Sequence, residues 1–160
     1  MIFVTVGTQD KEFVRLIKKI DELVTLGKIQ DQVIVQAGHT KYESNRIKIL
    51  NYIPFNEFND YLKQADVIIS HGGVGSILNG VKQLKPVIAV PRLYKYNEHI
   101  NDHQLQIVRK MSEEGYIISC EDENQLEEKI NLARTFKPKE FKSNTYSFLQ
   151  QFKKELNDIL

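Results

Sequence analysis

Short apolar runs alternate along this chain with segments in which apolar residues recur at helical spacing. Short runs rich in β-branched residues are typical of strands buried on both faces, and their alternation with amphipathic helices predicts a parallel sheet. We therefore expect an α/β fold: a Rossmann-like open parallel sheet with helices on both faces. The expected strands cover residues 2–6, 32–37, 47–52, 66–70, 86–91 and 116–119.

Helices are expected between these strands, at residues 13–24, 54–62, 74–84, 102–114 and 123–133. Gly27 and Gly115 are placed to end the first and the fourth of them. Phe55 and Leu84 fall on the apolar stripes of their helices and are expected in the core. A last helix, about 143–160, carries Phe148, Phe152 and Leu156 on one face. Amphipathic helices pack on their own domain or contact a partner, and both options stay open here.

Length and charge narrow the class of protein. The chain of 160 residues fits one domain, residues 1–160. Its 22 Lys and Arg balance 21 Asp and Glu, which argues against nucleic acid as a partner. Cys120 is the single cysteine, and neither a signal peptide nor a run of about 20 apolar residues is recognisable. We expect a cytoplasmic protein that reaches a membrane only through a partner.

The segment SHGGVGSILNG, Ser70–Gly80, follows the fourth expected strand and opens a helix. Its glycines Gly72, Gly73 and Gly75 would let an anion approach the helix N-terminus, while Ser76 adds a hydroxyl donor and Asn79 shares its helix face. The alternative is a tight turn in which glycine only relieves strain. The segment lacks GxGxxG, which disfavours a nicotinamide-dependent oxidoreductase, and it lacks GK[ST], so P-loop chemistry is not supported either. Replacing Gly73 by Asp is expected to abolish anion binding and leave the fold intact.

Two further loops are expected at the same edge of the sheet, since ligands bind beyond the carboxyl ends of parallel strands. One holds Gly7 and Thr8; the other runs from Pro91 to Gln104. The second loop offers two histidines, amides and carboxylates that suit sugar hydroxyls and phosphate oxygens. Asp102 can alternatively serve as a helix cap. His99 and His103 lie four residues apart but lack a third ligand with zinc spacing, so we expect no metal.

The motifs MIFVTVGTQ, ADVIISHGGVGSIL, KPVIAVPR and EHINDHQ together resemble small bacterial glycosyltransferase subunits of capsule and exopolysaccharide synthesis. These subunits are similar to the C-terminal, donor-binding half of MurG-like GT-B enzymes and to the soluble subunit of the eukaryotic two-component N-acetylglucosaminyltransferase. The resemblance covers about residues 1–120. It implies an inverting transfer of a hexose from a UDP-sugar to a polyprenyl-diphosphate-linked saccharide, without metal or other cofactor. A membrane-anchored partner subunit would supply the acceptor-binding half.

The resemblance also assigns roles to individual residues. It places Gly7, Thr8 and Gln9 in the first-strand loop, Asn79 at the ribose, where relatives often carry Glu, and Pro91 and Arg92 near the base. The phosphate loop would comprise Gly72, Gly73, Gly75 and Ser76, and the donor sugar would meet Asp102, His103 and Gln104. His71, Asp10 and His99 are candidates for the catalytic base by their chemistry, unless the partner supplies it. A non-catalytic nucleotide-sugar-binding or regulatory subunit is the alternative function.

Overall fold

The computed structural model describes residues 1–140 together with residues 147, 150 and 154. Most of the expected helix at 143–160, including Phe148, Phe152 and Leu156, therefore lies outside the described residues. In chain order the elements are β1 (Ile2–Thr5), α1 (Val14–Thr25), β2 (Val33–Gln36), β3 (Lys48–Leu50), α2 (Phe55–Gln64), β4 (Val67–Ser70), α3 (Val74–Lys82), β5 (Val87–Ala89), η1 (Tyr94–Tyr96), α4 (His103–Glu113), β6 (Ile118–Ser119), η2 (Glu123–Gln125) and α5 (Leu126–Ala133).

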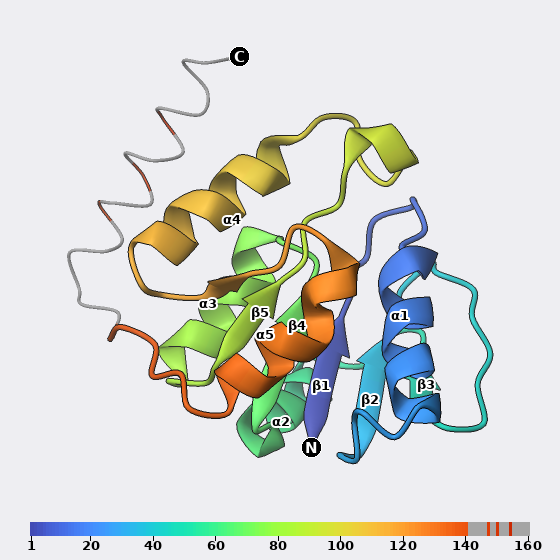
Figure 1. The fold of residues 1–160 in the computed structure, drawn as a ribbon. Helices are drawn as coiled ribbons and strands as arrows, with labels where there is room; N and C mark the ends of the chain where they lie inside the picture. The colour runs from blue at the N-terminus through green and yellow to red at the C-terminus, as the bar shows by residue number, and fades with distance from the viewer. Residues whose placement is uncertain (141–146, 148–149, 151–153, 155–160) are drawn as a thin grey trace.

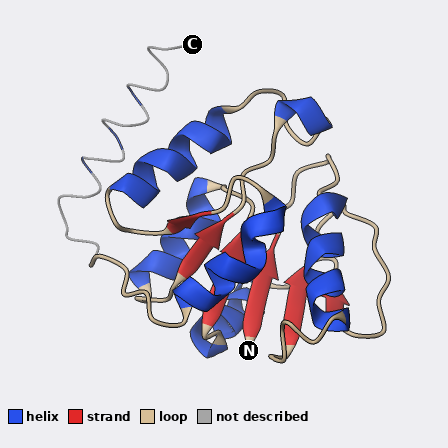
Figure 2. Ribbon diagram, viewed as in Figure 1, coloured by secondary structure: helices blue, strands red, loops and turns tan. Residues whose placement is uncertain are grey.

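The six strands form one parallel sheet in the order β3-β2-β1-β4-β5-β6 (Figures 1 and 2). All strand arrows point the same way, so the carboxyl ends of the strands share one edge of the sheet. The chain moves outward from β1 to β3 and then returns to the other side of β1 with β4. The edge between β1 and β4 is therefore the switch point at which α/β sheets of this order bind ligands. The predicted fold class is confirmed.

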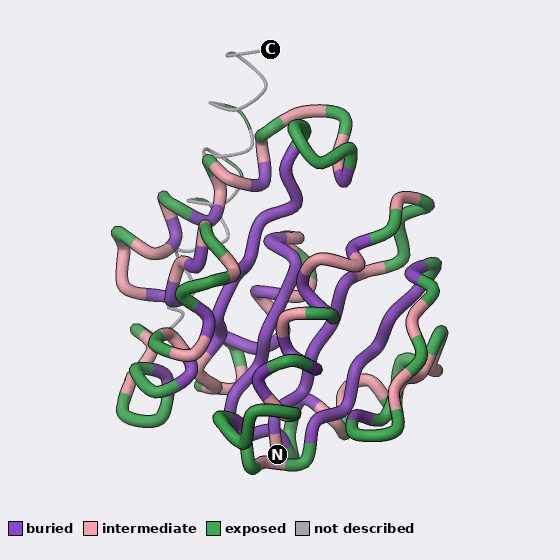
Figure 3. Tube along the Cα trace, turned by 45° about the vertical axis from the view of Figure 1, so that its right-hand side comes forward, coloured by how far each residue is buried: buried purple, intermediate pink, exposed green. Residues whose placement is uncertain are grey.

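Two hydrophobic cores lie on opposite faces of the sheet. Ile2 and Val4 of β1 face the core under α1 and α5, whereas Phe3 faces the core under α2, α3 and α4 (Figure 1). Alternate residues of each central strand thus pack against different helices, and the central strands β1, β2, β4 and β5 are buried throughout (Figure 3). This double burial is why the strands read as continuous apolar runs in the sequence.

Two residues expected in the core are exposed. Helix α3 ends at Lys82, two residues earlier than expected, and Leu84 follows it with a left-handed φ of 55° and 55% exposure. Phe55 stands at the start of α2 with 73% of its side chain exposed. The apolar periodicity is correct for the helices themselves but does not hold in the turns that begin and end them.

The expected boundaries differ from the structure by a few residues. The third strand was expected over 47–52 but extends only over Lys48–Leu50, and the short η1 and η2 turns were not expected. The ends of the first and fourth helices are as predicted, with Gly27 and Gly115 in left-handed conformations just beyond them. Within the described part of the chain, no helix is both long and apolar enough to cross a membrane.

Candidate functional site

A cavity of about 400 Å³ opens at the switch point, on the edge where β1 and β4 end. Its size falls within the range of about 300–1,000 Å³ that is usual for small-molecule sites. Three connections build it: those that follow β1, β3 and β4. The lining residues are Thr5, Gly7, Thr8, Gln9, Gln36, Tyr52, Ile53, Phe55, Phe58, His71, Gly73, Gly75 and Ser76.

The start of α3 forms one wall of the cavity. Gly73 precedes the helix in an extended conformation, and no described side chain caps the first turn. The N–H groups of that first turn lack partners within the helix and carry its positive dipole end, so they suit an anion. The Ser76 side chain stands beside them on the cavity wall.

The three glycines of this segment differ in what requires them. Gly72 has a φ of +85°, which favours glycine, and a Cβ on Gly73 would collide with Nε2 of His71. Gly75 is helical and exposed, and a Cβ there would meet nothing within 4 Å. Glycine in a helix costs about 1 kcal/mol relative to alanine. The fold thus requires glycine at positions 72 and 73 but not at position 75. The missing side chain of Gly75 leaves open space where the helix faces the cavity.

His71 is held in one orientation at the back of the cavity. Its ring lies between Gly7 and Gly73, and a Cβ on Gly7 would come within 2.7 Å of it. Its Nδ1 lies 3.2 Å from the carbonyl oxygen of Thr5, which can only accept a hydrogen bond. Nδ1 therefore carries the proton, and Nε2 has no hydrogen-bond partner among the described residues. Burial, and secondly the charge of Arg92, lower the pKa of His71 to about 4, so the ring is neutral at pH 7.

The floor and the opposite wall of the cavity contain residues that sequence reasoning missed. Gln36, at the end of β2, accepts a hydrogen bond from the Thr5 hydroxyl at 2.7 Å and donates to the Gly7 carbonyl oxygen at 3.3 Å. Tyr52, which follows β3, and Phe55 and Phe58 of α2 supply an aromatic wall. The rule that all parallel strands end at one edge could have included this connection, but Tyr52 was assigned to the third strand and Phe55 to the apolar face of the helix.

Seven of the sequence-predicted residues line the cavity: Gly7, Thr8, Gln9, His71, Gly73, Gly75 and Ser76. The others lie outside its lining: Asp10, Gly72, Asn79, Pro91, Arg92, His99, Asp102, His103 and Gln104. Asn79, predicted at the ribose, is one helical turn beyond Ser76 and half-buried. The glycine loop and the first-strand loop are therefore brought together, while the loop of residues 91–104 stands beside them.

The 91–104 loop abuts the glycine loop through Gly72. A Cβ on Gly72 would lie 3.3 Å from Cα of Pro91 and 3.4 Å from Cβ of Gln104. The Gln104 side chain is buried, and its oxygen accepts a hydrogen bond from the Arg92 amide at 3.1 Å. Gln104 thus supports the loop from within.

Asp102 occupies the N-cap position of α4, but its side chain makes no capping bond. Its Oδ1 accepts instead from the Tyr94 amide at 2.9 Å, and Asn101 Oδ1 accepts from the His103 amide at 3.1 Å. The alternative that Asp102 caps the helix is therefore wrong, because its carboxylate closes the preceding loop and Asn101 bonds to the first helical residue.

Arg92 was predicted near the base of the nucleotide, but the structure places its guanidinium inside the protein. The residue is 1% exposed, and its nitrogens donate to the carbonyl oxygens of Val6 at 2.7 Å, Lys11 at 2.7 Å and Glu98 at 3.2 Å. Its guanidinium carbon lies 5.0 Å from the centre of the Phe13 ring. Arg92 joins the first-strand loop to its own loop and does not line the cavity.

The other two candidate bases lie at the side of the cavity. The amide nitrogen of Gln9 is 3.3 Å from Nε2 of His99, which therefore accepts, while Nδ1 of His99 lies 3.1 Å from the Asn101 carbonyl oxygen. Burial lowers the pKa of His99. Asp10 is exposed and lines a separate hollow of about 560 Å³ with Lys11, Arg15 and Glu98. In the described residues, no group of three His, Cys, Asp or Glu could hold a metal ion.

The strand order and the cavity at the switch point define a doubly wound α/β domain with a small-molecule site. Over residues 1–159 the sequence matches the glycosyltransferase family 28 C-terminal domain. The chain belongs to this family and is a glycosyltransferase domain.

Among curated proteins the similar ones are UDP-N-acetylglucosamine transferase subunits ALG13. The human protein is 30% identical over 131 residues, covering 74% of this chain and 11% of its own length. The Saccharomyces cerevisiae protein is 32% identical over 79 residues, covering 48% of this chain and 37% of its own length. The chain thus spans about a tenth of the human relative.

Solved structures with the same fold include glycosyltransferases. The solution NMR structure of ALG13 superposes with a TM-score of 0.59 at 23% identity, covering 94% of this chain and 93% of that chain. The glycotransferase of kitacinnamycin gives 0.61 at 16% identity, covering 84% of this chain and 34% of that chain. The UDP-GlcNAc 2-epimerase of Methanocaldococcus jannaschii gives 0.58 at 16% identity, covering 84% and 38%. These likenesses support the fold, one half of a GT-B architecture.

Proposed function

We propose that this chain is the donor-binding, catalytic subunit of a two-component inverting glycosyltransferase that uses a UDP-sugar. The observation that carries the proposal is the uncapped, glycine-rich start of α3 facing a cavity of nucleotide size. The names of the similar ALG13 proteins favour UDP-N-acetylglucosamine as the donor. The family membership supports the transfer reaction.

The chemistry of the cavity walls supports one orientation of the donor, which is part of the proposal. The diphosphate lies at the first turn of α3, over Gly75 and beside Ser76, where amides and the helix dipole offset its charge. The uracil and ribose occupy the cavity against Tyr52, Phe55 and Phe58, since an aromatic wall stacks a base. The sugar then extends along the glycine loop toward the 91–104 loop, where His99 and His103 offer hydrogen bonds.

During transfer the acceptor hydroxyl attacks C1 of the sugar, the C1–O bond to UDP breaks, and UDP leaves with the bonding electrons. The α3 amides stabilise the charge that develops on the leaving diphosphate. A base must take the hydroxyl proton. Of the three candidates His71 alone lines the cavity, but a pKa of about 4 makes it a weak base. We assign the base to the partner subunit and give Nε2 of His71 the role of accepting a hydrogen bond from a substrate hydroxyl.

The partner, the acceptor and the setting are part of the same proposal. A GT-B site lies between two domains, and the described residues form one of them. A membrane-anchored partner would supply the acceptor-binding half, present a polyprenyl-diphosphate-linked saccharide, and keep this chain at the inner face of the membrane. A role in capsule or exopolysaccharide synthesis stays a prediction from the sequence motifs.

Binding tests the proposal first. Ligand that binds only the native state raises the melting temperature, so UDP and UDP-N-acetylglucosamine should stabilise the protein, whereas NADH should not. UDP-galactose and UDP-glucuronate in the same series would define the sugar. Absence of stabilisation by every uridine ligand would refute the proposed donor site.

Turnover separates the catalytic subunit from the alternative, a non-catalytic nucleotide-sugar-binding module. The chain is mixed with membranes that contain its candidate partner, and transfer of labelled sugar is followed. Transfer that requires both components, and that is lost when the donor site of this chain is altered, supports catalysis here. A partner that is active alone would favour the module.

A further inference from the structure

One glutamate fixes the loop of residues 91–104 from beneath. Glu98 is 4% exposed, and its carboxylate accepts from Nε and Nη2 of Arg15, both at 2.9 Å. The same carboxylate accepts from the Leu93 amide at 3.1 Å, five residues earlier in the loop. The Glu98 backbone oxygen accepts from Arg92 at 3.2 Å. Glu98 is thus bonded to two arginines, through its side chain to one and through its main chain to the other.

Arg15 is well placed to act as the anchor of this arrangement. It projects from the first turn of α1, and its guanidinium carbon lies 5.1 Å from the centre of the Phe13 ring and 4.8 Å from the centre of the Tyr96 ring. It also donates to Glu123 at 2.7 Å and to the Pro91 carbonyl oxygen at 3.2 Å. A charge-assisted, bidentate pair between side chains only 12% and 6% exposed is far stronger than a surface pair.

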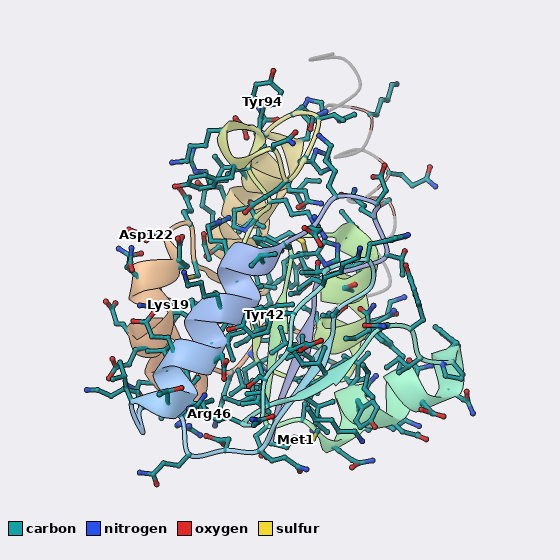
Figure 4. All side chains as sticks on the ribbon, turned by 90° about the vertical axis from the view of Figure 1, so that its right-hand side faces the viewer. Met1, Lys19, Tyr42, Arg46, Tyr94 and Asp122 are labelled. Carbon is teal, nitrogen blue, oxygen red and sulfur yellow. The ribbon has the colours of Figure 1, made fainter. Side chains whose placement is uncertain are left out.

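Arg92, 1% exposed, also ties this loop to the first-strand loop through its bonds to the Val6 and Lys11 carbonyl oxygens. The remaining side-chain contacts between the two loops are exposed. Lys11 Nζ lies 3.0 Å from Asn97 Oδ1, and the Gln9 amide lies 3.3 Å from His99. Exposed polar contacts of this kind contribute little, because water competes for both partners. Figure 4 labels Tyr94, in the same loop, at the end of the molecule opposite Met1, so the loop stands at the carboxyl edge of the sheet. The position of His99 at that edge therefore depends on Arg92, through the main chain, and on the side chain of its neighbour Glu98.

We propose that Glu98, held by Arg15, is a positioning residue that sets the 91–104 loop where it meets the sugar half of the donor. The inference rests on the proposed function. No residue of this loop lines the cavity assigned to the uridine and diphosphate, so the loop acts on the sugar and not on the nucleotide. Loosening the loop weakens recognition of the sugar and leaves the nucleotide in place.

The test compares two probes, UDP and UDP-N-acetylglucosamine, by calorimetric titration of the full chain. Glu98→Gln keeps the shape of the side chain and removes the charge that binds Arg15. We expect its affinity for UDP to stay within about twofold of wild type and its affinity for UDP-N-acetylglucosamine to fall about tenfold, the size of effect that a misplaced group gives. Glu121→Gln is the matched control: it breaks an exposed bidentate pair with Arg109, at 2.7 Å, and should change neither affinity.

Hydrogen exchange gives a second readout that does not depend on the sugar. The Leu93 amide donates to Glu98, so Glu98→Gln should speed its exchange and that of the following loop residues, while the strands keep their protection. Arg15→Lys, which keeps the charge but not the fork of donors, should act in the same direction more weakly and serves if Glu98→Gln fails to fold.

Any other result contradicts either the positioning role of Glu98 or the proposed donor site. Equal loss of both affinities in Glu98→Gln would make Glu98 an ordinary stabilising residue. If Glu98→Gln bound both probes with wild-type affinity, the loop would be held in place without the Glu98–Arg15 pair. Wild-type protein that binds neither probe would overturn the donor site itself, and the role of Glu98 with it.

Discussion

Nδ1 of His71 lies 3.2 Å from the carbonyl oxygen of Thr5, so the loop after β4 is hydrogen-bonded to the end of β1 through a buried imidazole. The two residues lie 66 positions apart in the sequence. This bond closes the back of the cavity and requires a neutral ring with its proton on Nδ1. Its consequences are measurable in the stability of the protein.

Acid should destabilise the protein through His71. The pKa of His71 is lowered from 6.5 to about 4 in the native state, chiefly by burial, so between these values the unfolded state binds more protons. The free energy of unfolding therefore falls as the pH drops from 6.5 to 4, by about 2 kcal/mol at pH 5 from this residue. Urea denaturation of His71→Asn between pH 7 and 5 should show a shallower loss than wild type. Parallel curves would contradict the assignment.

Gly75 should control anion binding without controlling the fold. A side chain there enters open space, so Gly75→Ala is expected to fold and to gain up to about 1 kcal/mol in stability. Gly75→Asp should also fold, because a carboxylate suits the first turn of a helix. It should reduce UDP affinity by about tenfold or more through charge repulsion. Calorimetric titration with UDP compares the two variants, and equal affinities would remove the diphosphate from this helix end.

An added methyl group at Gly73 should destabilise the protein, in contrast to the same change at Gly75. Its Cβ would collide with the ring of His71, which is fixed between Gly7 and Thr5, so Gly73→Ala must displace the imidazole or the loop. Overpacking of this kind costs about 1–3 kcal/mol. Thermal unfolding of Gly73→Ala beside Gly75→Ala measures the difference with the same added methyl group. Equal melting temperatures would show that the loop yields freely.

Phe55 is exposed in the structure and should become covered when the nucleotide binds. Loss of an aromatic stacking surface costs about 1–3 kcal/mol per base, so Phe55→Ala should weaken UDP binding by about fivefold or more. Its unfolding free energy should hardly change, because the side chain is 73% exposed. Leu26→Ala removes a similarly exposed side chain at the far end of α1 and is the control. Unaltered affinity in Phe55→Ala would move the base away from the aromatic wall.

The sequence predicted the architecture well because buried parallel strands and amphipathic helices leave separate periodicities. The apolar run of Ile2–Val6, for example, is buried from end to end, as its composition indicates. Turns were less predictable. Leu84 lies beyond the end of α3 in a left-handed conformation, which a helical pattern does not reveal. For the Gly73→Asp variant the structure shows an obstacle that the sequence does not reveal: a Cβ at Gly73 meets the ring of His71, whose position depends on a strand far away in the sequence.

The sequence predicted only two parts of the candidate site, the first-strand loop and the glycine loop. The glycines and the Ser76 hydroxyl stand out in a local segment, and of these Gly73, Gly75 and Ser76 line the cavity. Arg92 also stands out locally, as a cation in a loop at the correct edge. Its partners are backbone carbonyl oxygens contributed by other loops, which have no signature in the sequence. From sequence alone, a charged residue near a site can therefore be mistaken for a ligand-binding residue when its role is to hold neighbouring loops together.

Arg92 bonds to the carbonyl oxygens of Val6 and Lys11, 86 and 81 residues away in the chain. The first-strand loop and the 91–104 loop can therefore take their final shapes only after β5 has joined the sheet. The binding site for UDP therefore forms in the same cooperative transition as the whole fold. UDP binding should disappear at the same denaturant concentration as the far-ultraviolet circular dichroism signal. An amino-terminal fragment that keeps Gly72, Gly73 and Gly75 but ends before β5 should therefore be unable to bind UDP.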